Sequence, residues 1–324
     1  MITLDKQIQV LHSELGQSEI LHNSISAKPL EGYPDIFIGR NSDGDLLVLF
    51  VDSEIDALPA KKYQNLRIEF SSHYQLEVES EIVTKAFTLL RLSESDSVLR
   101  QTFCTVIASV ITTLPQNFTT HEVRLVVGKV IDLFTSAPKV SKNTVVGLYG
   151  ELAVIKFAKD PNIAARAWHS SPQAKTDFSF GKYFLEIKTT EGESRTHTIR
   201  THQLIQPAIE IYIGSVKLTP DTSSHNLLEF LHSVLSLLTP ENQSHVVEVF
   251  FKTIGFDLEE ISEMRYAVLG GSEEILIFKA SDLPRPVEQE GKFGAAIGKV
   301  EFELNLTTLL TLGVDHESLS EIGL

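Results

Sequence analysis

The chain has 324 residues, 28 of them Lys or Arg and 43 Asp or Glu, which gives a formal net charge of −15 at pH 7. This length suffices for two or three domains with a sizeable core, and 42% hydrophobic residues is ordinary for a globular protein. The charge argues against a general nucleic-acid-binding surface, the single Cys104 excludes an internal disulfide, and no apolar run approaches the length of a transmembrane helix.

Residues 1–137 are predicted to form a β-rich and helical N-terminal domain. Its first residues lack the pattern of a secretory signal, and their apolar spacing indicates an amphipathic helix through Leu4, Ile8, Leu11 and Leu15. We therefore expect a cytoplasmic protein with no membrane contact. Strand-like runs follow up to about residue 95, including a hairpin with its turn at 41–44. Helices over about 97–114 and 120–134 complete this domain. Cys104 lies in the first of them and is interpreted as a buried packing residue.

A linker over 134–143 precedes a predicted central domain, residues 138–219. A helix capped by Asn143 or Thr144 runs to about Lys159 and ends at the Asp-Pro pair that follows. The next expected elements are a strand at 165–170, a hairpin at 175–190, a strand near "RTHTIR", a short helix from Thr201 and the strand "IEIYIGSVKL". Residues 220–324 are predicted to be a C-terminal α+β domain, with helices at about 224–237 and 240–253 and then three strands.

The hairpin "KTDFSFGKYFLEIKTT" carries the most informative charges of the chain. With Gly181 and Lys182 as its turn, Asp177 lies opposite Glu186, and Lys188 shares their face because side chains alternate along a strand. Two opposed carboxylates repel each other, which a bound divalent cation would reverse. A lysine beside them can position an attacking water or stabilise charge that builds on phosphorus. The alternative is an exposed face held by a weak Glu–Lys contact.

The helix before the hairpin contributes a third carboxylate. Glu151 falls inside an apolar stripe, and a buried carboxylate is costly unless it meets a partner. It either reaches solvent at the edge of the stripe or points at the same cation. Nearby basic residues give this part of an acidic chain a locally neutral to positive balance. Candidates for nucleic-acid contacts, or alternatively solvated surface charges, are Lys175, Lys182, Arg195 and Arg200.

A helix bearing Glu, followed by Asp and Glu-x-Lys on adjacent strands, resembles the PD-(D/E)XK nuclease superfamily. "GLYGELAVIKF", Trp168, "DFSF", "LEIKTT" and "HTIRTHQL" are similar to one bacterial family within it. The resemblance implies an α/β (α+β) fold with a restriction-endonuclease-like core, a mixed sheet flanked by helices. It implies metal ligation by Asp177, Glu186 and Glu151, a catalytic Lys188, and a polar Gln203 after the core strands. Thr176 stands where the motif's name has Pro, which supplies no ligand.

The resemblance also implies a function. Its members occur beside ATPase, helicase-like and methyltransferase genes in restriction-type phage-defence clusters. The expected activity is Mg²⁺-dependent, or Mn²⁺-dependent, endonucleolytic cleavage of DNA, with those gene products as partner subunits and a homodimer as the expected assembly. RNA remains open as a substrate. The alternative is a non-catalytic subunit that keeps the nuclease fold for assembly or DNA recognition.

Overall fold

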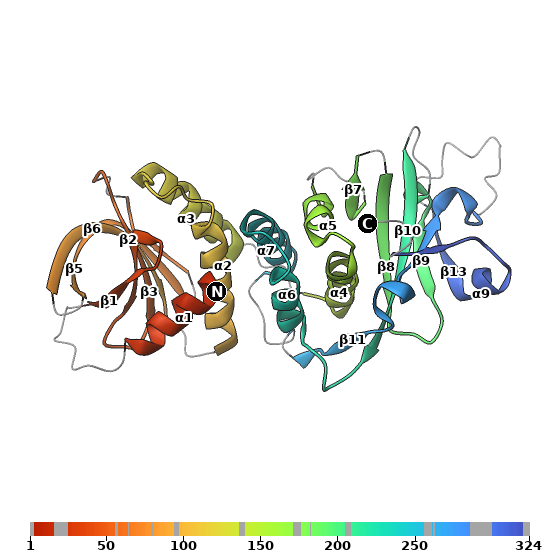
Figure 1. Ribbon diagram of the computed structural model, residues 1–324, viewed down its shortest axis with the longest axis horizontal. Coiled ribbons are helices and arrows are strands. Elements are labelled where there is room, and N and C mark those ends of the chain that lie inside the picture. Colours follow the sequence, from red (N-terminus) through yellow and green to blue (C-terminus); the bar gives the residue numbers. More distant parts are fainter. Residues whose placement is uncertain are drawn as a thin grey trace. The chain divides into compact units, whose positions relative to one another are not determined.

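The computed structural model describes most of the chain and divides it into two compact units, Met1–Pro138 and Lys139–Leu324 (Figure 1). The predicted linker lies at their junction. Within the described residues, no helix combines the length and apolar character needed to cross a bilayer. The described residues are 3–15, 25–55, 58–63, 65–78, 81–93, 97–135, 140–170, 176–181, 183–204, 209–255, 261, 263–285 and 300–319.

The first unit is built around a strongly curved sheet. Its strands follow the order β1-β2-β3-β6-β5-β4, and β1 also pairs with β5 in parallel, so that five strands form a closed path. The apolar residues on its inner face, among them Phe37, Leu49 and Phe87, make up a separate core. The strands are β1 Ile25–Leu30, β2 Tyr33–Arg40, β3 Leu46–Val51, β4 Lys61–Lys62, β5 Leu66–Val78 and β6 Glu81–Leu92.

Among the described residues of this unit, three helices complete the fold and confirm the predictions: α1 Leu4–Glu14, α2 Ser97–Ile111 and α3 Thr120–Thr135. Helix α2 contacts both α1 and α3. Its second half is buried throughout, which explains the apolar run in its sequence. Cys104 is fully buried there, and burial raises the pKa of its thiol to about 12, as expected for a packing residue.

The second unit contains a mixed sheet in the order β14-β12-β10-β8-β7, as predicted for this fold class. Strands β8 and β10 are parallel, while β7 and β12 run antiparallel to their neighbours. β11 pairs with the far end of β10, and β9 and β13 form a separate two-stranded sheet. The strands are β7 Phe178–Phe180, β8 Tyr183–Thr190, β9 Thr196–Arg200, β10 Glu210–Pro220, β11 Tyr266–Val268, β12 Leu276–Lys279, β13 Glu301–Asn305 and β14 Glu317–Ser318.

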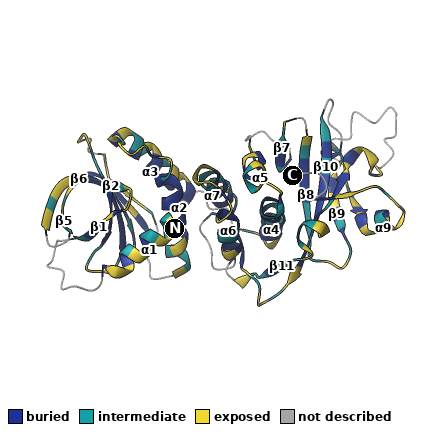
Figure 2. Cartoon of the chain, in the orientation of Figure 1, coloured by how far each residue is buried: buried dark blue, intermediate teal, exposed yellow. Residues whose placement is uncertain are grey.

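Helices cover one side of this sheet (Figure 1). They are α4 Lys142–Phe157, α5 Pro161–Ala167, α6 Leu227–Leu235 and α7 Pro240–Ile254. Helix α4 contacts β8, β10 and the three other helices, and it is buried over most of its surface (Figure 2). The other side carries β9, β13 and α9 Leu306–Thr311, packed on β10 through an apolar core that includes Ile199, Ile213 and Leu304. The described part of this unit also contains the short 3₁₀ helices η1 Thr201–Gln203, η2 Gly271–Glu274 and η3 Ala280–Asp282.

Two local predictions in this unit are wrong. The residues 165–170 were expected to form a strand, but α5 runs to Ala167, because Asp160 caps it, Pro161 opens it and three alanines favour it. The cap of α4 is Ser141, whose hydroxyl accepts a hydrogen bond from the Thr144 amide. The expected domain boundary at 219/220 falls at the end of β10, with which β11 and β12 pair.

Candidate active site

The hairpin of β7 and β8 has the predicted register near its turn. Phe180 pairs with Tyr183 and Phe178 with Leu185, and Gly181 has the positive φ of 76° that the turn needs. The ladder ends there, so the predicted pairing of Asp177 with Glu186 is not formed. Asp177 instead turns its carboxylate toward β8, where Oδ2 accepts a hydrogen bond of 2.6 Å from the Ile187 amide. The side chain is thereby fixed at the end of β7.

Helix α4 brings Glu151 against the sheet from one side. The close approach depends on the preceding Gly150, because a Cβ there would overlap with Thr189 Oγ1 and lie 3.3 Å from Ile187 Cγ2. Glu151 Oε2 accepts a hydrogen bond of 2.7 Å from the indole Nε1 of the fully buried Trp168. The carboxylate is therefore held in one orientation and is only 16% exposed.

Replacing Gly150 by alanine is expected to destabilise the protein by about 1–3 kcal/mol, because the added methyl group overpacks the contact with β8. Gly147 is a matched control in the same helix, since a Cβ there meets nothing within 4 Å. Its replacement by alanine is expected to stabilise the helix by about 0.5–1 kcal/mol. Thermal or urea unfolding of both variants measures the difference. Equal effects of the two substitutions would contradict this account of the α4–β8 contact.

Glu186 and Lys188 lie on the opposite face of β8. The intervening Ile187 faces Gly150 on α4, and strand residues alternate between faces. Lys188 Nζ lies 2.8 Å from Glu186 Oε1, and both side chains are largely buried, with 19% and 9% exposed. Gln203 in η1 donates its side-chain Nε2–H to the same oxygen and accepts from the Arg200 amide through its own Oε1. Three of the predicted residues thus form one hydrogen-bonded group.

Asp177 connects these groups electrostatically. Its pKa is raised well above the usual range, first by burial and then by the charges of Glu151 and Glu186. The hydrogen bond from the Ile187 amide and the charge of Lys188 oppose the rise only in part. A buried carboxylate between two others lacks positive charge. A divalent cation would supply it, and carboxylate oxygens are suitable ligands, so the residues present fit such an ion.

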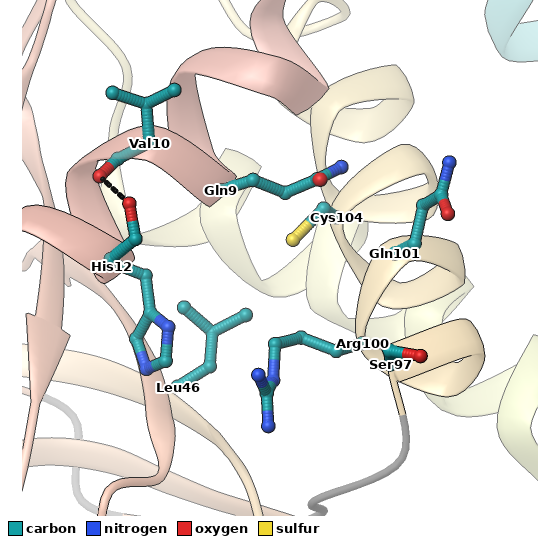
Figure 3. A pocket seen from close by; sticks show the side chains of 9 residues that line it. Gln9, Val10, His12, Leu46, Ser97, Arg100, Gln101 and Cys104 are labelled. Atoms are coloured by element: carbon teal, nitrogen blue, oxygen red, sulfur yellow. Dashed lines mark hydrogen bonds between the residues drawn. The ribbon is translucent and has the colours of Figure 1, made fainter.

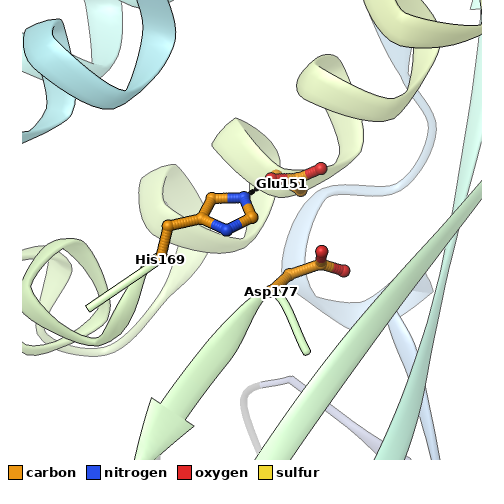
Figure 4. Close-up of side chains that lie close together, drawn as sticks. All are labelled: Glu151, His169 and Asp177. Carbon is orange, nitrogen blue, oxygen red and sulfur yellow. Dashed lines mark hydrogen bonds and ion pairs between the residues drawn. The ribbon is translucent and has the colours of Figure 1, made fainter. Parts of the chain in front are cut away.

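The atoms best placed to hold a cation belong to Glu151, His169 and Asp177, whose potential ligand atoms all lie within 4.8 Å of one another. Figure 4 shows the three side chains turned toward one another from α4, from the segment after α5 and from the end of β7. His169 Nε2 lies 3.0 Å from Glu151 Oε2. Glu186, a predicted metal ligand, is not part of this described cluster. Its Oε1 contacts Lys188 and Gln203.

His169 is a candidate site residue that the sequence did not reveal. It follows α5 and has a positive φ of 41°, which is uncommon outside glycine and is frequent at functional sites. Its amide donates a hydrogen bond of 2.8 Å to the Asp177 carbonyl. The only signal in the sequence is a histidine next to the one tryptophan, and no motif spacing connects it with residues 151 and 177.

The His169→Asn variant is expected to bind Mn²⁺ about 10-fold or more weakly, with a much smaller change for Mg²⁺. Imidazole nitrogen is a good ligand for transition metals, whereas Mg²⁺ prefers oxygen ligands. Even mutations of residues that only orient the metal ligands commonly lower metal affinity about 10-fold or more. Titration calorimetry with each metal measures the ratio of affinities. The exposed His225 provides a matched control through His225→Asn. Unchanged Mn²⁺ affinity in His169→Asn would exclude the imidazole as a ligand.

Arg195, which was expected to contact nucleic acid, lies inside the fold. The residue is only 5% exposed. Its guanidinium donates hydrogen bonds to the backbone carbonyls and side chains of Ser215 and Glu274. The Ser215 hydroxyl also lies 2.8 Å from His197 Nε2, and burial together with Lys188 and Arg195 lowers the pKa of His197 to about 4. Arg195 therefore connects β9 to β10 and η2 inside the fold.

Arg200 is the other described residue that was expected to contact nucleic acid. Arg200 lies at the end of β9, where its side chain is 49% exposed and forms an ion pair of 2.6 Å with Glu301. A phosphate would have to compete with that carboxylate or bind beside it. Lys175 and Lys182 lie outside the described residues.

A mixed sheet flanked by helices, with Asp177 and the Glu186-x-Lys188 pair at its edge, defines a protein of the nuclease-like PD-(D/E)XK class. A family model described as "Putative PD-(D/E)XK family member" (DUF4420) matches residues 13–307, which is most of the chain. The chain belongs to this family. No curated protein and no solved structure shows significant similarity to it.

Proposed function

We propose that the protein is a divalent-metal-dependent endonuclease that hydrolyses phosphodiester bonds of DNA. The observation that supports this most strongly is the closeness of the Glu151 and Asp177 carboxylates, whose potential ligand atoms lie within 4.8 Å of each other. The charge of Glu186, which is bonded to Lys188, also raises the pKa of Asp177. Carboxylates are crowded in this way at a cost in stability. The same arrangement is useful where a cation and a phosphate must be held together.

Each residue has a distinct part in the proposed reaction. Glu151 and Asp177, with His169, would hold the metal, which supplies Lewis-acid polarisation of the scissile phosphate when it is bound. Lys188 would position the attacking water and stabilise negative charge at phosphorus through its ammonium group. Glu186 would accept a proton from that water or complete the ligand set. Gln203 is a positioning residue, since it fixes the Glu186 carboxylate by a hydrogen bond.

The substrate and partners are proposed on the acidity of the chain together with the resemblance to restriction-associated nucleases. A net charge of −15 disfavours tight binding of DNA by the chain alone, because phosphate contacts need clustered cations. We therefore propose that partner subunits of ATPase, helicase-like and methyltransferase type supply DNA affinity in a cytoplasmic anti-phage defence system. Cutting both strands usually takes two active sites, which a homodimer would provide.

The test is cleavage of supercoiled plasmid DNA with Mg²⁺ or Mn²⁺ and with EDTA. Wild-type protein is expected to nick DNA only with metal, and Glu186→Gln to lose most of this activity. Glu210→Gln is a matched control, because Glu210 lies in β10 of the same sheet and also pairs with a lysine, Lys279, at 2.6 Å. Loss of activity in both variants would point to the sheet and not to the site.

The second candidate is a non-catalytic subunit for assembly or DNA recognition. It is supported by the bonding of Glu186 Oε1 to Lys188 and Gln203, which resembles a structural ion-pair network. The two candidates differ in metal binding. A protein that neither cuts DNA nor binds Mn²⁺ would contradict the nuclease proposal and favour this alternative.

A further inference from the structure

The first unit contains a cavity between α1, α2 and β3, lined by Val10, Leu46 and Cys104 among others (Figure 3). None of the side chains that line it indicates a particular ligand. The second unit carries a clearer signal, because a side chain from outside the candidate site is bonded to the backbone of that site. This side chain is His245 of α7.

Both polar groups of the peptide between Trp168 and His169 are fixed by hydrogen bonds. The His169 amide donates to the Asp177 carbonyl at 2.8 Å. The Trp168 carbonyl lies 2.7 Å from Nε2 of the half-buried His245. A carbonyl oxygen only accepts, so this imidazole nitrogen carries the proton. The peptide is thereby held between the end of β7 on one side and α7 on the other.

The orientation of this peptide determines where two donors of the candidate site lie. Trp168 Nε1 and His169 Nε2 approach the same atom, Oε2 of Glu151, at 2.7 and 3.0 Å. His169 has a positive φ of 41°, and such a conformation persists only where the surroundings fix it. This φ angle describes rotation of the very peptide whose carbonyl His245 holds. His245 therefore acts on the position of the His169 ring through the backbone.

Helix α7 is bonded to α5 at a second place, which provides a comparison. The buried Asn242 donates a hydrogen bond of 2.8 Å from Nδ2 to Oδ1 of Asn162, near the start of α5. His245 lies three residues further along α7 and bonds the segment that follows the end of α5. Both side chains fasten α5 to α7, but only His245 touches the segment that carries His169.

We infer that His245 is a positioning residue of the metal cluster and that it sets the preference of the site for transition metals over Mg²⁺. The inference rests on the proposed function, in which His169 is a metal ligand. Imidazole nitrogen binds transition-metal ions such as Co²⁺ well, whereas Mg²⁺ prefers oxygen ligands. Turning the peptide would displace the His169 ring, while Asp177 keeps its own hydrogen bond from the Ile187 amide. Loss of the His245 donor should therefore weaken the binding of Co²⁺ more than that of Mg²⁺.

The test is titration calorimetry of the full chain with Co²⁺ and with Mg²⁺. His245→Phe keeps an aromatic ring but removes the donor, whereas His245→Gln retains an N–H group at a similar distance from the backbone. We expect His245→Phe to bind Co²⁺ about 10-fold more weakly with a much smaller change for Mg²⁺, and His245→Gln to resemble the wild type. Co²⁺ binding that persists in His169→Asn belongs to other sites and is subtracted.

Asn242→Ala is the matched control, because it also removes one hydrogen bond between α7 and α5. It should lower the Tm and leave the ratio of the two affinities unchanged. A wild-type ratio in His245→Phe, or an equal change of the ratio in Asn242→Ala, would overturn the inference while leaving the proposed function intact. A wild-type chain that binds neither metal would contradict the proposed function and, with it, the metal preference.

A second measurement needs neither metal nor nuclease activity. Trp168 is the single tryptophan of the chain, so its indole N–H gives one resonance in an NMR spectrum, and the chemical shift reports its hydrogen bond to Glu151. In EDTA, this resonance should move in His245→Phe and stay near its wild-type position in His245→Gln and Asn242→Ala. An unmoved resonance in His245→Phe would overturn the positioning role.

The wild-type chain itself protects the test against variants that fail to fold. Nitrogen NMR of the His245 ring should show the proton on Nε2, the atom that lies 2.7 Å from the Trp168 carbonyl. A ring protonated on Nδ1 alone cannot donate to that carbonyl. Such a result would overturn the inference without any substitution.

Discussion

Replacing Lys188 by alanine is expected to lower the rate of metal-dependent DNA cleavage by about 100- to 1,000-fold, the usual effect of removing one group that stabilises transition-state charge. The lysine Nζ lies 2.8 Å from Glu186 Oε1, so its loss removes the positive charge next to that carboxylate and to Asp177. The effect should appear in kcat more than in KM, since this contact forms chiefly in the transition state. Single-turnover cleavage of a labelled duplex measures it.

Lys279→Ala is the control for this prediction. Lys279 lies in β12 of the same sheet and pairs with Glu210 at 2.6 Å, so both variants lose one lysine of a Lys–Glu pair. The control should retain wild-type cleavage. A Lys188→Ala variant that cuts as fast as Lys279→Ala would show that the lysine has no part in the reaction.

Replacing Asp177 by asparagine is expected to stabilise the metal-free protein while abolishing metal binding. The carboxylate is buried beside Glu151 and Glu186, and asparagine removes its charge while retaining an oxygen for the Ile187 amide. Relief of such a charge is commonly worth about 0.5–2 kcal/mol at functional sites. With EDTA, the Tm of Asp177→Asn should exceed that of the wild type by several degrees. Mn²⁺ should raise the Tm of the wild type only, because a ligand stabilises the state that binds it.

The pH dependence of this difference has a definite sign. The pKa of Asp177 is raised in the folded state, so folding disfavours its charged form and stability falls as pH rises through that raised pKa. In EDTA, the advantage of Asp177→Asn should therefore grow toward neutral and alkaline pH and shrink in acid. The exposed Asp315 gives a control, Asp315→Asn, that leaves the buried carboxylates intact. A wild-type protein more stable than Asp177→Asn in EDTA at all pH values would contradict the proposed crowding of charge.

Local patterns account for the parts of the fold that the sequence predicts well. The long apolar run of α4, the turn residue Gly181 and the β-branched and aromatic residues of β10 are each a clear local signal, so the positions of these elements are confirmed. The parallel pairing of β1 with β5 joins residues distant in sequence, and no local pattern encodes it. The short apolar run of α5 resembles a strand. The residues form a helix because the Asp-Pro pair before them caps and opens it.

The sequence predicts some residues of the site and misses others, and both outcomes have physical reasons. Glu186, Lys188 and Gln203 form one bonded group because strand alternation and a short helix bring them together. The local sequence around Arg195 predicts a solvent-exposed charge. The residue is buried because Ser215 and Glu274, which are distant in sequence, accept its hydrogen bonds. His169 is brought to Glu151 by the end of a short helix and a positive φ, which composition does not reveal.

The central claim is that Glu151 and Asp177 hold a divalent cation, and binding of Mn²⁺ in solution tests it most directly. Electron paramagnetic resonance or calorimetry of wild-type protein, Asp177→Asn and Glu151→Gln gives the stoichiometry and affinity. The account predicts one high-affinity Mn²⁺ site per chain in the wild type and its loss in both variants, with Asp315→Asn unchanged. Equal Mn²⁺ binding by all four proteins would contradict the claim, because the crowded carboxylates would then have no part in holding the metal.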